Sequence, residues 1–431
     1  MGRKKKIKVL RVYLNGLLVG NLKKEASGLI AFRYGPEWIE QGFAISLSLP
    51  IQEEEFKGEV VSRYFDNLLP DNDEIRKTAA AKFGAESIRP FDLLAAIGRD
   101  CVGALSFLPE DIPTPQFFDL KYIKLNEKKI ANKIRGLGQV NPLGMEEGDF
   151  RISIAGAQEK TALLKMGKTW CEPQGMTPTT HIFKKSIGAL NMDIDFTDSI
   201  DNEWASLFLM KKFGINTCNA FIEQFEDQRV LVVERFDRKW VQKDGQKILL
   251  RVPQEDMCQA LGISPYKKYE NEGGPGILNI SKLLMASKDH DDRKSFFKTI
   301  MIFDLLYAPD GHGKNFSIFL GPDGFQLTPV YDVMGGYFLY KRERVPKNKL
   351  KLAMKVGASG HYGFERISKR HYEEMAKKCN LNKDVFVEIS RELQDSYNSL
   401  NIKDAELDSK LNQKTLNIIL EGMKKRVSRI L

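Results

Sequence analysis

The feature that most constrains the fold of this chain is a change in hydrophobic pattern near residue 251. Before it, short alternating or β-branched runs predominate, and residues 9–14 followed by the turn signal Asn15-Gly16 are the clearest strand and hairpin. After it, apolar residues recur at helical spacing, with one strand-rich interruption at residues 315–340. The helical segments are residues 281–287, 293–307, 371–378 and 383–400. A strand-rich half followed by a helix-rich half predicts an α+β architecture with a cleft between two lobes.

The first half also contains helical patterns, so it is itself mixed. These lie at residues 58–69, with a second at 71–82 that Asp71 could cap and a third at 90–97. Residues 44–50 alternate and predict a half-buried strand. At 431 residues the chain is long for one core. We expect three units: residues 1–148, 149–250 and 251–431. The first boundary follows a proline-bearing stretch, and the second is the change in hydrophobic pattern near residue 251.

The charge balance is mildly basic, with 66 basic and 57 acidic residues and a net charge of +9. Basic residues cluster at 3–8, 341–351 and 424–429. The simpler interpretation is a solvated surface; the alternative is contact with nucleic acid or with a partner bound to it. No helix-turn-helix, zinc-finger or RNP-type motif accompanies the clusters, so intrinsic sequence-specific DNA binding is not expected.

The cysteines and apolar runs indicate where the protein is found. Five cysteines without a short-spaced pair argue against both a disulfide framework and a zinc site. Lys8 and Arg11 interrupt what would be the apolar core of a signal peptide, and the apolar runs are too short to span a bilayer. We expect a cytoplasmic protein.

Three polar residues on either side of a predicted hairpin, residues 316–329, predict phosphoryl transfer. Asp310 is followed at +5 by Asn315, and a second carboxylate, Asp332, follows a predicted hairpin. One carboxylate can accept the proton of a substrate hydroxyl, while the amide oxygen and the other carboxylate are ligands that suit Mg²⁺. Gly311 and Gly313 would let the backbone turn tightly. The +5 spacing alone is weak, because a glycine-rich turn with an Asx cap produces it too.

Upstream segments could complete such a site. Residues 153–163 read as strand, small-residue turn and strand; such a turn can cradle phosphate, although a plain hairpin fits equally. Lys184 ends an apolar strand and could reach phosphates, and Glu203 could pair with it; a solvated lysine and simple helix-dipole compensation are the alternatives. The strand ending near Glu234 could join two lobes. No Walker loop, GxSxG or HExxH motif occurs.

Several of these strings together resemble the HipA family of bacterial toxin kinases, in the same order and over nearly the whole chain. They are residues 65–71, 89–94, 151–161, 178–182, 233–238, 253–259 and 310–315. The resemblance implies a two-lobed protein-kinase-like fold. Residues 1–148 would be the HipA-type N-terminal subdomain, 149–250 the kinase N-lobe with phosphate loop and hinge, and 251–431 the helical C-lobe.

The resemblance also implies residue roles. Asp310 would be the catalytic base, Asn315 and Asp332 the Mg²⁺ ligands, and Ser153 a site of autophosphorylation. A phosphate on Ser153 would place about −2 charge beside the nucleotide phosphates and inactivate the enzyme. The remaining residues would contact ATP: Ile154, Ala155, Gly156, Ala157, Gln158, Glu159, Lys160, Lys184, Glu234, Phe236, His312 and Lys314.

Family targets are serines in aminoacyl-tRNA synthetases, whose inhibition stalls translation and causes growth arrest and drug tolerance. The implied partner is a small helix-turn-helix antitoxin that binds operator DNA. Two departures stand at the catalytic loop: Pro309 replaces a small polar residue and Gly313 replaces the more usual Ala. Two other functions stay open, a DNA-bound corepressor with a vestigial kinase site and a small-molecule kinase.

Overall fold

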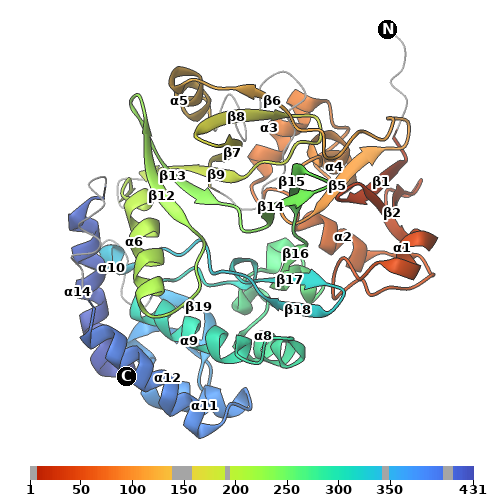
Figure 1. The fold of residues 1–431 in the computed structure, drawn as a ribbon. Coiled ribbons are helices and arrows are strands. Elements are labelled where there is room, and N and C mark those ends of the chain that lie inside the picture. The colour runs from red at the N-terminus through yellow and green to blue at the C-terminus, as the bar shows by residue number, and fades with distance from the viewer. Residues whose placement is uncertain (1–6, 138–157, 190–194, 342–348, 401–410) are drawn as a thin grey trace.

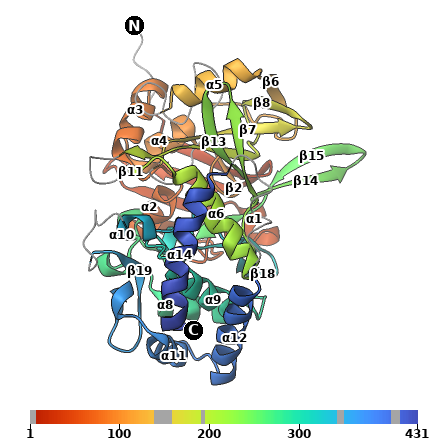
Figure 2. The ribbon, with the colours of Figure 1, turned by 90° about the vertical axis from the view of Figure 1, so that its left-hand side faces the viewer.

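The computed structural model describes residues 7–137, 158–189, 195–341, 349–400 and 411–431. Its architecture is α+β, with the first half of the chain in the upper part of Figure 1 and the helices of the second half below. Figure 2 shows the same division from the side, with the hairpin of β14 (Arg238–Lys243) and β15 (Gln246–Arg251) projecting from the body. Within the described ranges, no helix is both long and apolar enough to cross a bilayer.

The N-terminal unit is built on a five-stranded antiparallel sheet in the order β4-β3-β2-β1-β5. Asn15 and Gly16 have φ values of 47° and 89°, the positive values that a tight hairpin turn of this kind requires. The strands are β1 (Val9–Leu14), β2 (Leu17–Lys24), β3 (Ile30–Tyr34), β4 (Phe56–Lys57) and β5 (Leu105–Pro109). The helices are α1 (Pro36–Gln41), α2 (Glu59–Asp66), α3 (Asp73–Phe83) and α4 (Pro90–Ile97).

Two local predictions for this unit are wrong. Residues 44–50 form no named strand; Ile45 and Leu49 are buried in the core, while only an isolated bridge joins Ser46 to Leu49. The alternation of apolar and polar residues therefore corresponds to a loop with buried apolar side chains and not to a strand. The N-cap of α3 is Asn72, whose side chain accepts from the backbone N–H groups of Glu74 and Ile75, and not Asp71.

A second, six-stranded sheet has the order β12-β13-β9-β7-β8-β6. Its strands are β6 (Lys121–Lys124), β7 (Lys160–Met166), β8 (Thr169–Gln174), β9 (His181–Lys185), β12 (Ala220–Phe225) and β13 (Gln228–Glu234). Helix α5 (Glu127–Arg135) packs its apolar face on this sheet, and α6 (Ser199–Lys212) lies beside β12 and β13. The short pair β10 (Gly188–Ala189) and β11 (Asp195–Phe196) precedes α6. Because β6 and α5 pack on this sheet, its contacts favour a unit boundary before residue 121. The predicted boundary at residue 148 lies outside the described residues and stays a prediction.

The C-terminal unit combines two small sheets with helices. A separate hairpin, β14 (Arg238–Lys243) and β15 (Gln246–Arg251), packs Leu249 on Leu164 and Cys171 of the six-stranded sheet. The strands of the C-terminal unit are β16 (Gln254–Asp256), β17 (Ser317–Gly321), β18 (Gly324–Leu327), β19 (Lys351–Val356) and β20 (His361–Gly363). Its helices are α7 (Met257–Ala260), α8 (Ile277–Leu283), α9 (Asp292–Leu305), α10 (Tyr337–Lys341), α11 (Lys369–Lys378), α12 (Lys383–Asn398) and α14 (Gln413–Ile430). One large apolar core joins most of them to α6.

A buried ion pair fastens α14 onto this core. Arg426 donates to Asp304 of α9 at 2.7 and 2.8 Å, and Tyr372 of α11 donates to the same carboxylate at 2.9 Å. Arg426 is only 1% exposed, so the basic cluster at 424–429 is not simply the solvated surface that its composition indicated. All five cysteines are buried and free, as expected.

Candidate active site

The segment between α9 and β17 brings together the three residues predicted to carry the chemistry. Asn315 donates from its amide nitrogen to the backbone carbonyl of Asp310 at 2.6 Å and to that of Asp332 at 3.5 Å. The β17–β18 hairpin returns the chain, so that Asp332 lies beside Asn315 although 17 residues separate them. Asp332 has a φ of 58°, a left-handed conformation that is uncommon for aspartate.

The two glycines of this loop are explained by close packing. Neither Gly311 nor Gly313 has a positive φ. A Cβ on Gly311 would lie 2.8 Å from the Phe303 ring, and one on Gly313 would lie 2.5 Å from Pro275 and 2.9 Å from the Cys258 Sγ. The expected tight turn is present at Gly311, where the His312 N–H donates to the Asp310 carbonyl at 2.9 Å, and close packing is a second reason for glycine at both positions.

Lys184 reaches into the same place from the sheet. Its ammonium donates to Glu203 of α6 at 2.6 Å and to Oδ1 of Asp332 at 2.8 Å. We call Lys184, Glu203 and Asp332 the catalytic cluster. Burial lowers the pKa of Lys184, but the two carboxylates outweigh it and the net shift is upward. Burial would likewise raise the pKa of Asp332, but Lys184 and Lys160 outweigh it and hold that pKa well below its usual range.

A second lysine lies next to this cluster. Lys160 begins β7 and is the cross-strand partner of Lys184 in the register with β9. Burial, together with the nearby Lys184 charge, lowers the pKa of Lys160 to about 8. Next to it, Gln158 donates to the backbone carbonyl of Lys185 at 2.7 Å, and Glu159 lies 4.0 Å from the Lys185 ammonium. Of the predicted phosphate loop, Ser153, Ile154, Ala155, Gly156 and Ala157 lie outside the described residues.

Asp310 is the most accessible carboxylate of the site, with 42% of its side chain exposed. Tyr269, from the loop between α7 and α8, donates its hydroxyl to Oδ1 of Asp310, and its ring packs edge-on against the His312 imidazole. His312 is buried, with Nε2 3.7 Å from the same oxygen, and burial lowers its pKa below the ordinary value. Tyr269 was not predicted, because nothing in its local sequence marks it as a partner of Asp310.

Lys314, predicted to contact ATP, is directed elsewhere. Its ammonium lies 2.6 Å from Oδ1 of Asp71 and 3.4 Å from the backbone carbonyl of Asn67, both in the N-terminal unit. Lys268 binds the other Asp71 oxygen at 3.1 Å. Burial alone would raise the pKa of Asp71, but the two lysines outweigh it and lower it to about 2. This geometry does not support a phosphate contact for Lys314; it fastens the catalytic loop to the N-terminal unit.

The strand end at Glu234 and Phe236, predicted to contact ATP, leads from the six-stranded sheet into the β14–β15 hairpin. The backbone N–H groups of Glu234 and Arg235 donate to the carbonyls of Asn219 and Thr180 at 2.8 and 2.9 Å. Glu234 is exposed and accepts from the Asn219 side chain at 3.1 Å. The Phe236 ring packs 5.6 Å from that of Tyr331 and 5.7 Å from that of Phe319, measured between centroids.

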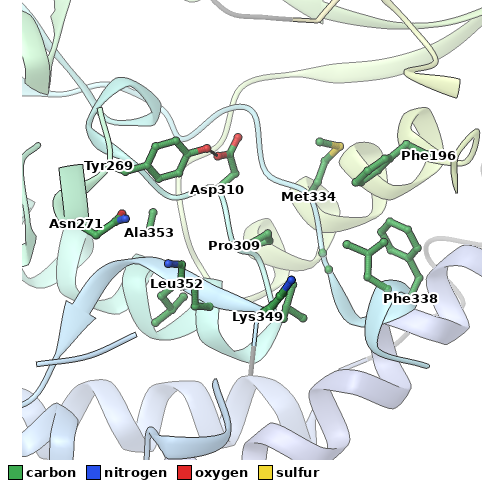
Figure 3. A pocket seen from close by; sticks show the side chains of 15 residues that line it. Phe196, Tyr269, Asn271, Pro309, Asp310, Met334, Phe338, Lys349, Leu352 and Ala353 are labelled. Atoms are coloured by element: carbon green, nitrogen blue, oxygen red, sulfur yellow. Dashed lines mark hydrogen bonds between the residues drawn. The ribbon is translucent and has the colours of Figure 1, made fainter. Parts of the chain in front are cut away.

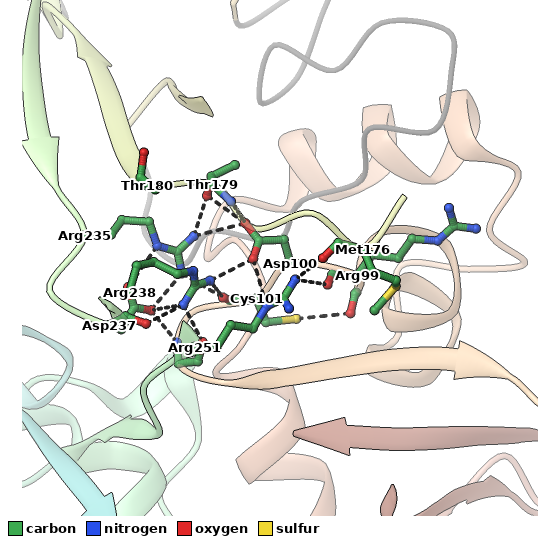
Figure 4. Close-up of polar contacts among 12 residues, drawn as sticks. Arg99, Asp100, Cys101, Met176, Thr179, Thr180, Arg235, Asp237, Arg238 and Arg251 are labelled. Atoms are coloured by element: carbon green, nitrogen blue, oxygen red, sulfur yellow. Dashed lines mark hydrogen bonds and ion pairs between the residues drawn. The ribbon is translucent and has the colours of Figure 1, made fainter. Parts of the chain in front are cut away.

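Directly after this strand lies a group of buried charges that we call the hinge cluster (Figure 4). It consists of Asp100, Arg235, Asp237, Arg238 and Arg251. Asp100 lies 2.8 Å from the Arg238 guanidinium and also accepts from the Thr179 hydroxyl at 2.7 Å. Asp237 accepts from the backbone N–H of Gly103 at 2.8 Å. The cluster therefore joins the N-terminal unit to the segment between the lobes.

The donor set of the site fits a hard divalent cation. Since the amide nitrogen of Asn315 is committed to backbone carbonyls, its side-chain oxygen is the atom able to bind a metal. Lys184 contacts Oδ1 of Asp332, and Oδ2 is the second carboxylate oxygen that could bind one. Among the described residues, this site included, no three His, Cys, Asp or Glu side chains form a metal-binding group, so the protein would supply only these two oxygen ligands. Two oxygen ligands suit an ion completed by phosphates and water.

Fold and site together define the class: a two-lobed, protein-kinase-like enzyme, with a lysine–glutamate pair in the sheet lobe and an Asp–Asn–Asp set in the helical lobe. Family models match both parts, the HipA N-terminal domain over residues 10–108 and the HipA-like C-terminal domain over residues 152–400. This chain belongs to the HipA family of bacterial serine/threonine-protein kinase toxins, as the sequence resemblance indicated.

Individual relatives agree with this assignment. The chain is 32% identical over 359 residues to the putative kinase Y4mE of Sinorhizobium fredii, which covers 81% of each chain. It is 31% identical over 338 residues to the serine/threonine-protein kinase toxin HipA of Shewanella oneidensis, covering 75% of this chain and 74% of that one. A solved structure of the Shewanella oneidensis MR-1 toxin–antitoxin complex of HipA, HipB and operator DNA has the same fold, with a TM-score of 0.74, 24% identity and 98% of both chains covered.

Proposed function

We propose that this chain is an ATP- and Mg²⁺-dependent serine/threonine protein kinase that acts as the toxin of a toxin–antitoxin pair. The observation that carries the proposal is the meeting of Lys184, Glu203 and Asp332 within hydrogen-bond distance, beside Asn315 and Asp310. A lysine, together with a cation held by one amide oxygen and one carboxylate, is what a transferring phosphoryl group needs for charge neutralisation.

Each side chain then has a role consistent with its contacts. Asp310 is partly exposed and orients the acceptor hydroxyl and takes its proton. Asn315 and Asp332 hold Mg²⁺, which neutralises phosphate charge when bound. Lys184 and Lys160 face the phosphates with the loop of residues 154–159, and the strand end at Glu234 and Phe236 adjoins the adenine.

The biological part of the proposal follows the family. The substrate would be a serine of an aminoacyl-tRNA synthetase, whose modification stalls translation and arrests growth, and Ser153 would be phosphorylated by the chain itself to inactivate it. The partner would be a HipB-like helix-turn-helix antitoxin, with operator DNA reached through it. This accords with the relative that was solved together with HipB and its operator DNA.

The experiment is phosphate incorporation by the purified chain in Mg-ATP, followed at Ser153 by mass spectrometry. We expect Asp310→Gln to reduce the rate by about 10²–10⁴-fold, the range for loss of a general base. Asp323→Asn is the matched control, because Asp323 is an exposed carboxylate in the β17–β18 turn. Undiminished incorporation in Asp310→Gln would remove Asp310 from the catalytic role.

A growth assay separates the toxin from the alternative, a DNA-bound corepressor with weak kinase activity. Expression of the wild type should arrest growth, and Asp332→Gln should relieve the arrest. If both chains arrest growth equally, the toxicity does not come from kinase activity and the corepressor function gains support.

A further inference from the structure

A cavity of about 330 Å³ opens directly beside Asp310 (Figure 3). This volume is at the lower end of the range of roughly 300–1,000 Å³ for ligand pockets. Three parts of the helical lobe form its walls: the catalytic loop at Pro309, the segment after Asp332 at Met334, and strand β19 at Leu352. Its lining is mainly apolar, and Asp310 contributes the carboxylate at one end.

Part of the cavity wall is formed by packed, buried side chains, and part of its rim is exposed to solvent. The Phe196 and Phe338 rings pack edge-on at 5.3 Å between centroids, closing one side. Leu352 and Ala353 are buried in β19. By contrast, Lys349 and Lys351 are exposed at the rim. The cavity is apolar, has cationic residues at its rim and opens beside Asp310. It therefore suits one side chain of a bound peptide. A free nucleotide would fit less well, because its phosphates would need a cation inside the cavity.

We infer that this cavity is the substrate-specificity pocket of the kinase and that it binds an aliphatic side chain adjacent to the phosphoacceptor serine. The inference rests on the proposed function of Asp310. A serine hydroxyl at Asp310 places the neighbouring residue about 3.8 Å away along the chain, measured between Cα atoms. Because the cavity opens beside Asp310, one of the two neighbouring residues is within reach of its mouth, where burial of an aliphatic side chain is favourable.

The chain's own acceptor sequence has this chemistry. Ser153 is flanked by Ile152 and Ile154, and Glu146, Glu147 and Asp149 precede it. The aliphatic neighbours suit the apolar walls, and the acidic residues complement Lys349 and Lys351 at the rim. The class of substrate is thus a segment in which isoleucine, leucine or valine adjoins the serine and acidic residues lie upstream.

The test uses the full-length kinase and a synthetic peptide of residues 146–159 as a separate substrate, with Mg-ATP. Two further peptides carry I152D or I154D, and a control peptide carries Q158D, which places the same charge away from the serine. We expect kcat/KM to fall at least tenfold for one of the isoleucine variants, equivalent to about 1.4 kcal/mol of lost apolar contact. The control should stay within about twofold, an effect of under about half a kcal/mol.

A variant of the enzyme checks that the cavity is responsible. Ala353→Leu should fill it and lower kcat/KM for the unmodified peptide, while ATP affinity measured by calorimetry stays unchanged. A peptide with alanine at the sensitive position should then be phosphorylated better by Ala353→Leu, relative to the unmodified peptide, than by the wild type. General damage to the fold would not produce this reversal.

The outcomes separate the two proposals. If the wild-type chain incorporates no phosphate at Ser153, the proposed function fails and this inference fails with it. If it phosphorylates Ser153 but treats the two isoleucine variants like the unmodified peptide, or ignores every peptide, only the specificity pocket is overturned.

Discussion

The catalytic cluster and the hinge cluster are both sets of buried opposite charges, but they differ in whether they are closed. In the hinge cluster every side chain is at most 4% exposed, and Asp100 and Asp237 are surrounded by three arginines. In the catalytic cluster Lys184 and Glu203 are 8% and 2% exposed, while 34% of the Asp332 side chain remains accessible. A closed set can only hold structure together, whereas an open one can exchange partners with a ligand.

The largest effect expected from this difference is on stability. Asp100→Asn should lower the free energy of unfolding by about 3–5 kcal/mol, because it leaves three buried arginines with one carboxylate. Asp332→Asn should change it by no more than about 1 kcal/mol, since Lys184 keeps Glu203 and the site is partly solvated. Urea unfolding of both variants measures the two values, and equal losses would contradict the comparison.

Acid unfolding sharpens the same prediction. Burial would raise the pKa of Asp100, but Arg238, Arg235 and Arg251 outweigh it and hold that pKa below the unfolded value of about 4. Its contribution is therefore fully present above about pH 4 and is lost as the pH falls through the folded-state pKa. Asp100→Asn should show a weaker loss of stability in this acid range than the wild type.

A smaller effect is expected on nucleotide affinity at alkaline pH. The pKa of Lys160 is lowered to about 8 by burial and by Lys184, and bound phosphates would raise it again. Nucleotide binding then favours the protonated lysine, so the apparent Kd for Mg-ATP should increase by up to about tenfold per pH unit above pH 8. Calorimetry from pH 6.5 to 9.5 measures this dependence.

Lys160→Arg is the matched control, because arginine stays charged throughout this range. It should bind Mg-ATP with little change in Kd between pH 7 and 9.5. If the pH dependence persists in Lys160→Arg, another group is responsible and Lys160 does not contact the phosphates.

The sequence predicted the chemical groups of the site better than their structural partners. Lys184, Glu203, Asp310, Asn315 and Asp332 could be recognised because the reaction demands their residue types and the hairpin after Asn315 is visible as alternation. The hairpin turn at Asn15-Gly16 and most helices were also predictable from local patterns.

What could not be predicted depends on contacts between distant segments. Asp71 and Asn72 are both acceptable N-caps, and only the position of Lys314, 243 residues further on, reveals that Asp71 is an ion-pair partner. Likewise, the charged helix α14 was not anticipated, because Arg426 is buried only by virtue of Asp304, 122 residues away. Spacing along the chain carries no information about such pairs.

The smallest expected effect concerns Tyr269. It tests whether the Asp310 carboxylate is fixed by its partners, as in the hinge cluster, or free to exchange them for a ligand, as in the catalytic cluster. Tyr269→Phe removes one hydrogen bond to Oδ1 of Asp310 and leaves Oδ2 for an acceptor hydroxyl. We expect the rate of Ser153 phosphorylation to fall about fivefold, near 1 kcal/mol, because the carboxylate loses one constraint. The KM for ATP should not change, because the hydrogen bond removed is to Asp310, the residue proposed to face the acceptor hydroxyl. A faster variant would mean instead that the Tyr269 hydroxyl occupies the place of the substrate hydroxyl, and that Asp310 is held closed until the substrate displaces it.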